Sequence, residues 1–152
     1  MIVSFCGHSD FSPTEENERV MLEILERRVG NTDAEMYLGG YGGFDEFAYK
    51  CCRKYKESHR NVSLIFVTPY LSEKYLENKL GYPMVKYDGV VYPDIEDKPV
   101  RFAIEYRNKW MAEKSDLVIC FIARSYGGAY KTYSYAKRKG KEILNIHAVN
   151  VN

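Results

Sequence analysis

The chain has 152 residues, of which 45% are hydrophobic, and its 22 basic and 21 acidic residues nearly cancel. This length suits one well-cored domain, residues 1–152, and is too short for two domains of ordinary size. Because the net charge is close to zero, no strong field attracts nucleic acid or an anionic membrane, so we do not expect nucleic acid as the main partner. We expect no membrane partner and a cytoplasmic location, since the sequence contains neither an apolar run long enough to span a bilayer nor a signal peptide. The oligomeric state stays open between a monomer and a homo-oligomer.

The cysteines argue against a disulfide framework and against a metal site. Cys51 and Cys52 are adjacent, Cys6 and Cys120 lie in strand-like runs, and no C-x-x-C pair is present. We therefore expect four small buried side chains in a reducing compartment, with no metal and no cofactor.

The first half of the chain alternates strands and helices. Residues 2–7 are rich in β-forming side chains, and Ser12 to Glu15 carries a helix cap, a first-turn proline and a capping-box glutamate, so a helix is expected from there to about Val29. A short strand follows over residues 35–40. From residue 44 to residue 55, apolar side chains recur with helical spacing, which predicts an amphipathic helix.

The second half continues the alternation, so the pattern predicts an α/β fold with three layers. The segment between Gly81 and Pro99 has no clear period and is expected to be a long loop with room for a small hairpin. About five strands should form a mainly parallel sheet, and the usual order of such sheets is 3-2-1-4-5. The remaining expected elements are a strand over 62–70, a short polar helix over 72–79, a helix over 99–114, a strand over 117–123, a helix over 128–140 and a strand over 142–148.

Three strand-to-helix junctions fall where such sheets bind ligands. They read CGHSDF, GGYGGFDE and ARSYGGAY. Ligands of open α/β sheets bind beyond the carboxyl ends of the strands, near the point where the strand order reverses. In the expected order the first and third junctions flank that point, so their loops should converge.

Two of these junctions contain glycine pairs, which permit close approach of a ligand to the backbone and to a helix N-terminus. Gly40 and Gly42 fit the first two positions of G-x-G-x-x-G, but the third position falls on Asp45. The alternative is that the glycines only form tight turns. The two junctions together favour a phosphate-bearing ligand.

Arg107 interrupts the apolar stripe of the helix over 99–114, so its guanidinium is expected on the inward face. It then needs either a carboxylate of the protein or the anion of a ligand as partner, unless its head group reaches water. If the partner is the anion of a ligand, Arg107→Ala should weaken binding of a phosphate-bearing ligand by about 1.5–3 kcal/mol while the domain stays folded. Asn108 beside it offers an amide.

The carboxylates and His8 are further candidates. Asp45 and Glu46 lie in the first turn of a helix, where the helix dipole alone favours acidic residues, so their default role is structural. Glu96 lies in the long loop and could swing over the site. His8 ends the first strand, where it could bind a phosphate or a ribose.

Three stretches carry a resemblance: VSFCGHSDFSP, YLGGYGGFDEFAY and residues 92–146 with RNKWM and SYGGAY. Over nearly its whole length the chain resembles the superfamily of Rossmann-like domains that unites the LONELY GUY phosphoribohydrolases with DNA-processing protein A. By its RN-x-W-M and GGAY signatures it is most similar to an uncharacterised branch of small bacterial and phage proteins within that superfamily. The resemblance implies a Rossmann-like, nucleotide-binding domain.

The resemblance also implies site residues. The segment from Cys6 to Ser9 matches the first-strand motif of the phosphoribohydrolases, residues 39–43 match their glycine-rich turn, and Arg107 matches their helix arginine. Gly127 and Gly128 match the start of their last motif, G-G-x-G-T-x-x-E. The ligand-binding candidates are thus Gly7, His8, Ser9, Gly39, Gly40, Gly42, Gly43, Asp45, Asn108, Gly127, Gly128 and Tyr130.

The chain departs from that last motif at its end, because residues 130–134 read YKTYS and the glutamate that acts on the ribosyl group is missing. A carboxylate stabilises the oxocarbenium-like state of glycosidic cleavage, so binding of a nucleotide or nucleotide derivative, in the manner of a sensor, is the main expectation. The alternative is an N-glycosidase or deoxyribosyltransferase in which Arg107, Glu46 and Glu96 are catalytic. A weaker alternative is single-stranded DNA binding.

Overall fold

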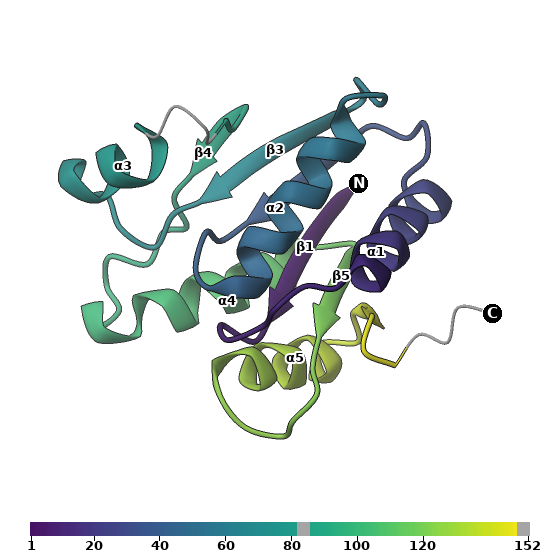
Figure 1. Ribbon diagram of the computed structural model, residues 1–152. Coiled ribbons are helices and arrows are strands. Elements are labelled where there is room, and N and C mark those ends of the chain that lie inside the picture. Colours follow the sequence, from purple (N-terminus) through teal and green to yellow (C-terminus); the bar gives the residue numbers. More distant parts are fainter. Residues whose placement is uncertain (82–85, 149–152) are drawn as a thin grey trace.

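One parallel sheet organises the protein in the computed structural model, which describes residues 1–81 and 86–148 (Figure 1). Six strands of the described residues lie in the order β4-β3-β2-β1-β5-β6, and each neighbouring pair is parallel. Their bounds are β1 (Ile2–Gly7), β2 (Ala34–Leu38), β3 (Val62–Val67), β4 (Gly89–Val91), β5 (Leu117–Phe121) and β6 (Glu142–Asn145).

Helices cover both faces of this sheet and complete three layers. Helices α1 (Glu15–Arg28) and α2 (Gly43–Lys56) pack on one face, whereas α4 (Ala103–Lys114) and α5 (Gly128–Arg138) pack on the other. A short 3-10 turn, η1 (Val100–Phe102), leads into α4, and α3 (Glu73–Leu80) lies beside the β3 and β4 edge (Figure 1).

The larger part of the core lies between the sheet and the helices α1 and α2. The expected helical spacing of α2 is confirmed, since its buried side chains are Phe44, Phe47, Ala48, Cys51, Cys52 and Tyr55. They pack with alternate residues of the central strands, among them Val3, Phe5, Met36, Leu38, Leu64 and Ile119. All four cysteines are buried free thiols, as expected from the sequence.

The sequence predicted the sheet well, with one strand missing from the prediction. The five expected strands are present in the expected order, and β4 is a sixth that joins the edge beside β3. It lies within the segment from Gly81 to Pro99, for which the sequence leaves room for a small hairpin. The strand is instead parallel to β3, and the residues described in this segment form no hairpin. The sheet is entirely parallel, not mainly so. Residues 82–85 of that segment lie outside the described residues.

The start of α1 differs from the expected capping box. Thr14, not Ser12, is the N-cap, and its hydroxyl accepts from the Asn17 backbone N–H at 3.1 Å. The Asn17 side chain completes the box by accepting from the Thr14 N–H at 3.0 Å. An asparagine thus replaces the predicted glutamate, because its oxygen reaches the same backbone donor.

The strand order reverses between β1 and β5. From β1 the chain proceeds outward through β2, β3 and β4, and it then returns to β5 on the other side of β1. The loops that follow β1 and β5 therefore lead to helices on opposite faces of the sheet, and the space between the two loops lies at its carboxyl edge.

Candidate functional site

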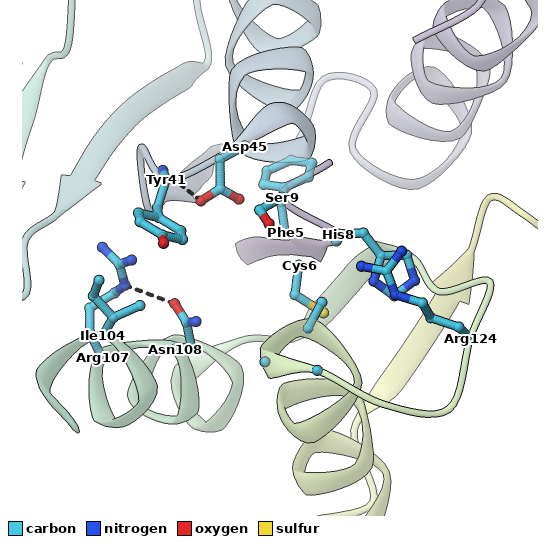
Figure 2. A pocket seen from close by; sticks show the side chains of 14 residues that line it. Phe5, Cys6, His8, Ser9, Tyr41, Asp45, Ile104, Arg107, Asn108 and Arg124 are labelled. Carbon is cyan, nitrogen blue, oxygen red and sulfur yellow. Dashed lines mark hydrogen bonds between the residues drawn. The ribbon is translucent and has the colours of Figure 1, made fainter. Parts of the chain in front are cut away.

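A cavity of about 330 Å³ lies at this reversal point. Figure 2 shows Asp45, Arg107, Asn108, His8 and Arg124 around it. The cavity joins the expected junctions: it is lined by Phe5, Cys6, Gly7, His8, Ser9, Tyr41, Asp45, Ile104, Arg107, Asn108, Arg124, Gly127, Gly128 and Ala129. The predicted convergence of the loops is confirmed.

His8 leaves β1 as a buried side chain, only 4% exposed. Its Nε2 accepts from the Ala123 backbone N–H at 3.0 Å, so Nε2 is unprotonated and the ring proton of the neutral form is on Nδ1. Burial lowers the pKa of His8, and the nearby Arg124 lowers it further. His8 is therefore a neutral group at physiological pH and fixes the loop after β5 to the end of β1.

Packing accounts for the glycines of the turn between β2 and α2. Gly42 has a φ of +89° as the N-cap of α2, and a Cβ there would lie 2.7 Å from the Ser9 Cα. Gly43 donates its N–H to the Ser9 carbonyl at 2.7 Å, and its Cβ would lie 2.2 Å from the Phe11 oxygen. The turn is pressed against the chain after β1, so these glycines are needed for the fold itself.

Asp45 places a carboxylate in the cavity from the first turn of α2. Its Oδ2 accepts from the Tyr41 backbone N–H at 2.9 Å (Figure 2). Burial raises the pKa of Asp45 to about 6, although Arg107 acts in the opposite direction. A partly buried acid with such a pKa in a cavity is typical of functional sites. From the sequence the default role of Asp45 is structural, because its position in the first turn of a helix does not reveal that the fold partly buries the carboxylate.

Arg107 lies on the inward face of α4, as its place on the apolar stripe predicts, and is 0% exposed. Among the described residues its hydrogen-bond partners are other than carboxylates: Nη1 donates to the backbone carbonyls of Gly39 and Val67, each at 2.8 Å. Nε donates to the Asn108 Oδ1 at 2.8 Å. Arg107 thus ties α4 to the ends of β2 and β3, and it also forms part of the cavity wall.

The glycines at the start of α5 have different surroundings from those of α2. Gly127 is the N-cap with a φ of +94°, which explains that glycine. Gly128 is not in the left-handed region, and a Cβ there would meet no heavy atom within 4 Å. No side chain caps α5 and no acidic residue lies in its first turn, whereas α2 carries Asp45 and Glu46 there. The α5 N-terminus is therefore open to an anion, and the α2 N-terminus is disfavoured by its acids.

Arg124 is a cavity residue that the sequence analysis missed. Its Nη1 and Nη2 each donate to Asp10 at 3.1 Å, which lowers the pKa of that carboxyl below its usual value. Its Nε is buried and has no hydrogen-bond partner in the described part of the chain. The sequence does contain a signal for it: Arg124 directly precedes the SYGG turn and follows the carboxyl end of β5, where ligands of such sheets bind.

A second cavity, of about 470 Å³, adjoins the first at Asp45, which lines both. Helix α3 closes one side of it, because the Lys79 Nζ donates to the Gly40 carbonyl at 2.7 Å. The lining residues are Gly40, Gly42, Gly43, Asp45, Glu46, Tyr49, Phe66, Lys79 and Tyr87.

Several predicted site residues do not line the first cavity. Gly40, Gly42 and Gly43 line only the second cavity, and Gly39 lines neither. Glu96 is exposed and lines a separate hollow with Tyr70 and Val100. Glu46 lies in the second cavity only, exposed and ion-paired with Lys50. Tyr130 lines neither cavity; its ring packs beside Tyr133 on the α5 side of the sheet, because its helix position directs it away from the opening.

The described residues contain neither a metal-binding cluster nor a membrane-spanning helix. They contain no group of three His, Cys, Asp or Glu side chains arranged to hold a metal ion. Within 1–81 and 86–148, every helix is too short or too polar to cross a bilayer.

Similarity to known proteins appears at the level of structure. No family model matches the sequence. No curated protein matches it either. DNA processing protein A from Helicobacter pylori is similar with a TM-score of 0.63 and 17% identity, over 94% of this chain and 63% of that one. The Streptococcus pneumoniae protein of that name gives 0.61 and 16%, over 93% and 48%.

The protein TM1055 is also similar, with a TM-score of 0.57 and 17% identity over 93% of this chain and 71% of that one. The chain spans about half to two thirds of the two DNA processing proteins. At these identities the likeness shows the fold alone: the chain has a Rossmann-like α/β fold in common with these structures.

Proposed function

We propose that the chain is a single domain that binds a phosphate-bearing nucleotide or nucleotide derivative in the cavity at the β1 and β5 ends. The observation that carries this proposal is Gly128. Neither its φ nor its packing requires a glycine, yet it lines the cavity at an uncapped helix N-terminus. A phosphate is the anion that such a site suits, because unpaired N–H groups and the helix dipole both favour negative charge.

The charged groups of the cavity support an asymmetric ligand. Arg124 lies on the α5 side, where its buried Nε–H is without a partner among the described residues. Asp45 lies on the α2 side and would repel a phosphate, but its oxygens are good acceptors for hydroxyl groups of a sugar. The phosphate is thus assigned to the α5 and Arg124 side, and the sugar to the Asp45 side.

One structural neighbour bears on the expectation that nucleic acid is not the main partner. The Helicobacter pylori structure concerns a single-stranded DNA binding mode of that protein. A single strand and a free nucleotide share a phosphate and a sugar, so both are ligands that the cavity chemistry accommodates. Our choice of a small ligand rests on the near-zero net charge of the whole chain.

Isothermal titration with inorganic phosphate, ribose 5-phosphate, AMP, adenosine and a short oligothymidylate tests the proposal. We expect AMP and ribose 5-phosphate to bind, and adenosine to bind at least about tenfold more weakly, because a charge-assisted bond contributes about 1.5–3 kcal/mol. Equal affinity for AMP and adenosine would refute the phosphate site. If the oligonucleotide binds and none of the small ligands does, the cavity is a site for single-stranded nucleic acid and not for a free nucleotide.

Gly128→Ala separates ligand binding from folding. We expect the variant to be unchanged or up to about 1 kcal/mol more stable, since alanine suits a helix better than glycine and the space is open. AMP affinity should fall about tenfold, because the new methyl group occupies the approach to the helix N–H groups. Thermal unfolding and titration measure the two effects.

Gly43→Ala is the matched control, since Gly43 is also the first residue of a helix after a glycine N-cap. Its Cβ would lie 2.2 Å from the Phe11 oxygen, so this variant should lose stability. If Gly128→Ala binds AMP as the wild type does, the phosphate does not lie at α5.

A second candidate function is cleavage of the N-glycosidic bond of the bound nucleotide. Asp45 favours it, because it supplies a carboxylate to the first cavity, which neither Glu46 nor Glu96 lines. In such a reaction the base leaves with a proton, water adds to the anomeric carbon, and the Asp45 carboxylate stabilises the oxocarbenium-like state. Release of free base from AMP that disappears in Asp45→Asn tests this. A wild type that releases no base from any common nucleotide removes the candidate.

A further inference from the structure

The second cavity is walled by aromatic rings. The Phe66 and Tyr87 ring centroids are 5.3 Å apart, and those of Tyr49 and Tyr87 are 5.2 Å apart. Gly40 faces these rings with a φ of +63°, and a Cβ there would lie 2.9 Å from the Phe66 ring. The turn therefore packs against Phe66, which is 0% exposed, and the partly buried rings of Tyr49 and Tyr87 complete the wall. A cavity with such a wall suits a flat ring, which gains both burial and stacking.

The two cavities are neighbours on the two sides of one side chain. Asp45 lines both, and the turn before it contributes Tyr41 to the first cavity and Gly40 and Gly42 to the second. A ligand with its phosphate at α5 and its sugar at Asp45 thus has the aromatic cavity next along its length.

The polar groups of the second cavity are mainly acceptors. Asp45 presents a carboxylate, and Glu46 presents a second one that is ion-paired with Lys50 at 3.0 Å. The Lys79 Nζ is engaged with the Gly40 carbonyl at 2.7 Å. Carboxylate oxygens accept hydrogen bonds and are best matched by N–H donors. An exocyclic amino group offers these carboxylates two N–H donors on one nitrogen, whereas uracil offers a single ring N–H between two carbonyl groups that repel them.

We propose that the second cavity binds the base of the nucleotide, and that it prefers amino-bearing bases such as adenine and cytosine over uracil. This rests on the proposed function, because the phosphate at α5 and the sugar at Asp45 place the base. It adds a specificity that the phosphate site cannot supply, since every nucleotide carries the same phosphate.

The experiment compares AMP, CMP, UMP and ribose 5-phosphate by titration of the wild type and of Tyr87→Leu. In the wild type, AMP should bind at least about tenfold more tightly than ribose 5-phosphate, because stacking of a base on an aromatic side chain usually gives a gain of this size. AMP and CMP should both exceed UMP. Tyr87→Leu should remove most of the AMP advantage and leave ribose 5-phosphate affinity unchanged.

Two further variants keep the result interpretable. Tyr87→Phe retains the ring and should bind AMP as the wild type does, and it serves if the leucine variant does not fold. Tyr106→Leu changes a tyrosine of α4 that lines neither cavity and should leave all four affinities unchanged.

The failures of the two proposals are distinguishable. If ribose 5-phosphate binds as tightly as AMP, or if Tyr87→Leu weakens both ligands equally, the base does not lie in the second cavity and the phosphate site stands. Equal affinity for AMP and UMP overturns the preference for amino-bearing bases. If neither AMP nor ribose 5-phosphate binds at millimolar concentration, the proposed function and this inference both fall.

Discussion

Arg107→Ala is expected to lower the free energy of unfolding by about 3–5 kcal/mol, the usual cost of removing one partner from a buried charged network. The side chain is 0% exposed, and without it the carbonyls of Gly39 and Val67 lose their common donor. Asp45 also loses the cation that lowers its pKa. Urea unfolding followed by circular dichroism measures the change.

Two variants make this measurement specific. Arg101→Ala removes an exposed arginine of η1 and should change the stability by less than about 0.5 kcal/mol. Arg107→Lys keeps the charge but cannot reproduce the planar fork, so it should fall between the wild type and the alanine variant. If the unfolding free energy of Arg107→Ala lies within about 1 kcal/mol of the wild-type value, the size of one ordinary hydrogen bond, the guanidinium is dispensable for the fold.

This expectation corrects the one from sequence, in which the alanine variant stays folded and loses only ligand affinity. Helix periodicity does predict that Arg107 faces inward, and the structure confirms it. Its partners could not be predicted, because they are backbone carbonyls 68 and 40 residues away in the chain. Any residue type offers a carbonyl, so the sequence carries no mark of which ones converge.

The two glycine junctions illustrate a second limit of the sequence. Both read as possible phosphate turns, yet Gly42 and Gly43 are pressed against the segment after β1 whereas Gly128 faces open space. The difference depends on the path of residues 9–11 over α2, which is a tertiary contact. Strand order and the α2 periodicity were predictable because they follow from local patterns and from general topology. The three-residue strand β4 was too short to show any period.

Asp45→Asn is expected to stabilise the protein by about 1–3 kcal/mol at pH 7, since a pKa shift of one unit corresponds to about 1.4 kcal/mol. In the folded state the pKa of Asp45 is raised from 3.8 to about 6. The fold therefore favours the protonated form, and this contribution is fully present below about pH 4. It is lost as the pH rises through about 6, where the folded protein must ionise a partly buried acid. Asparagine keeps an oxygen to accept from the Tyr41 N–H.

The measurement is the difference in unfolding free energy between Asp45→Asn and the wild type at several pH values from 4 to 8. That difference should grow from near zero at the acid end to its full value above pH 7, because only the wild type titrates at this position. Glu46→Gln, at the exposed neighbouring residue, should stay within about 0.5 kcal/mol of the wild type at every pH. A difference that does not vary with pH, or an asparagine variant that is less stable at pH 7, would mean that Asp45 is ionised in the fold at little cost. Stabilisation would instead identify Asp45 as a residue that costs stability in its position, as functional residues of binding sites commonly do.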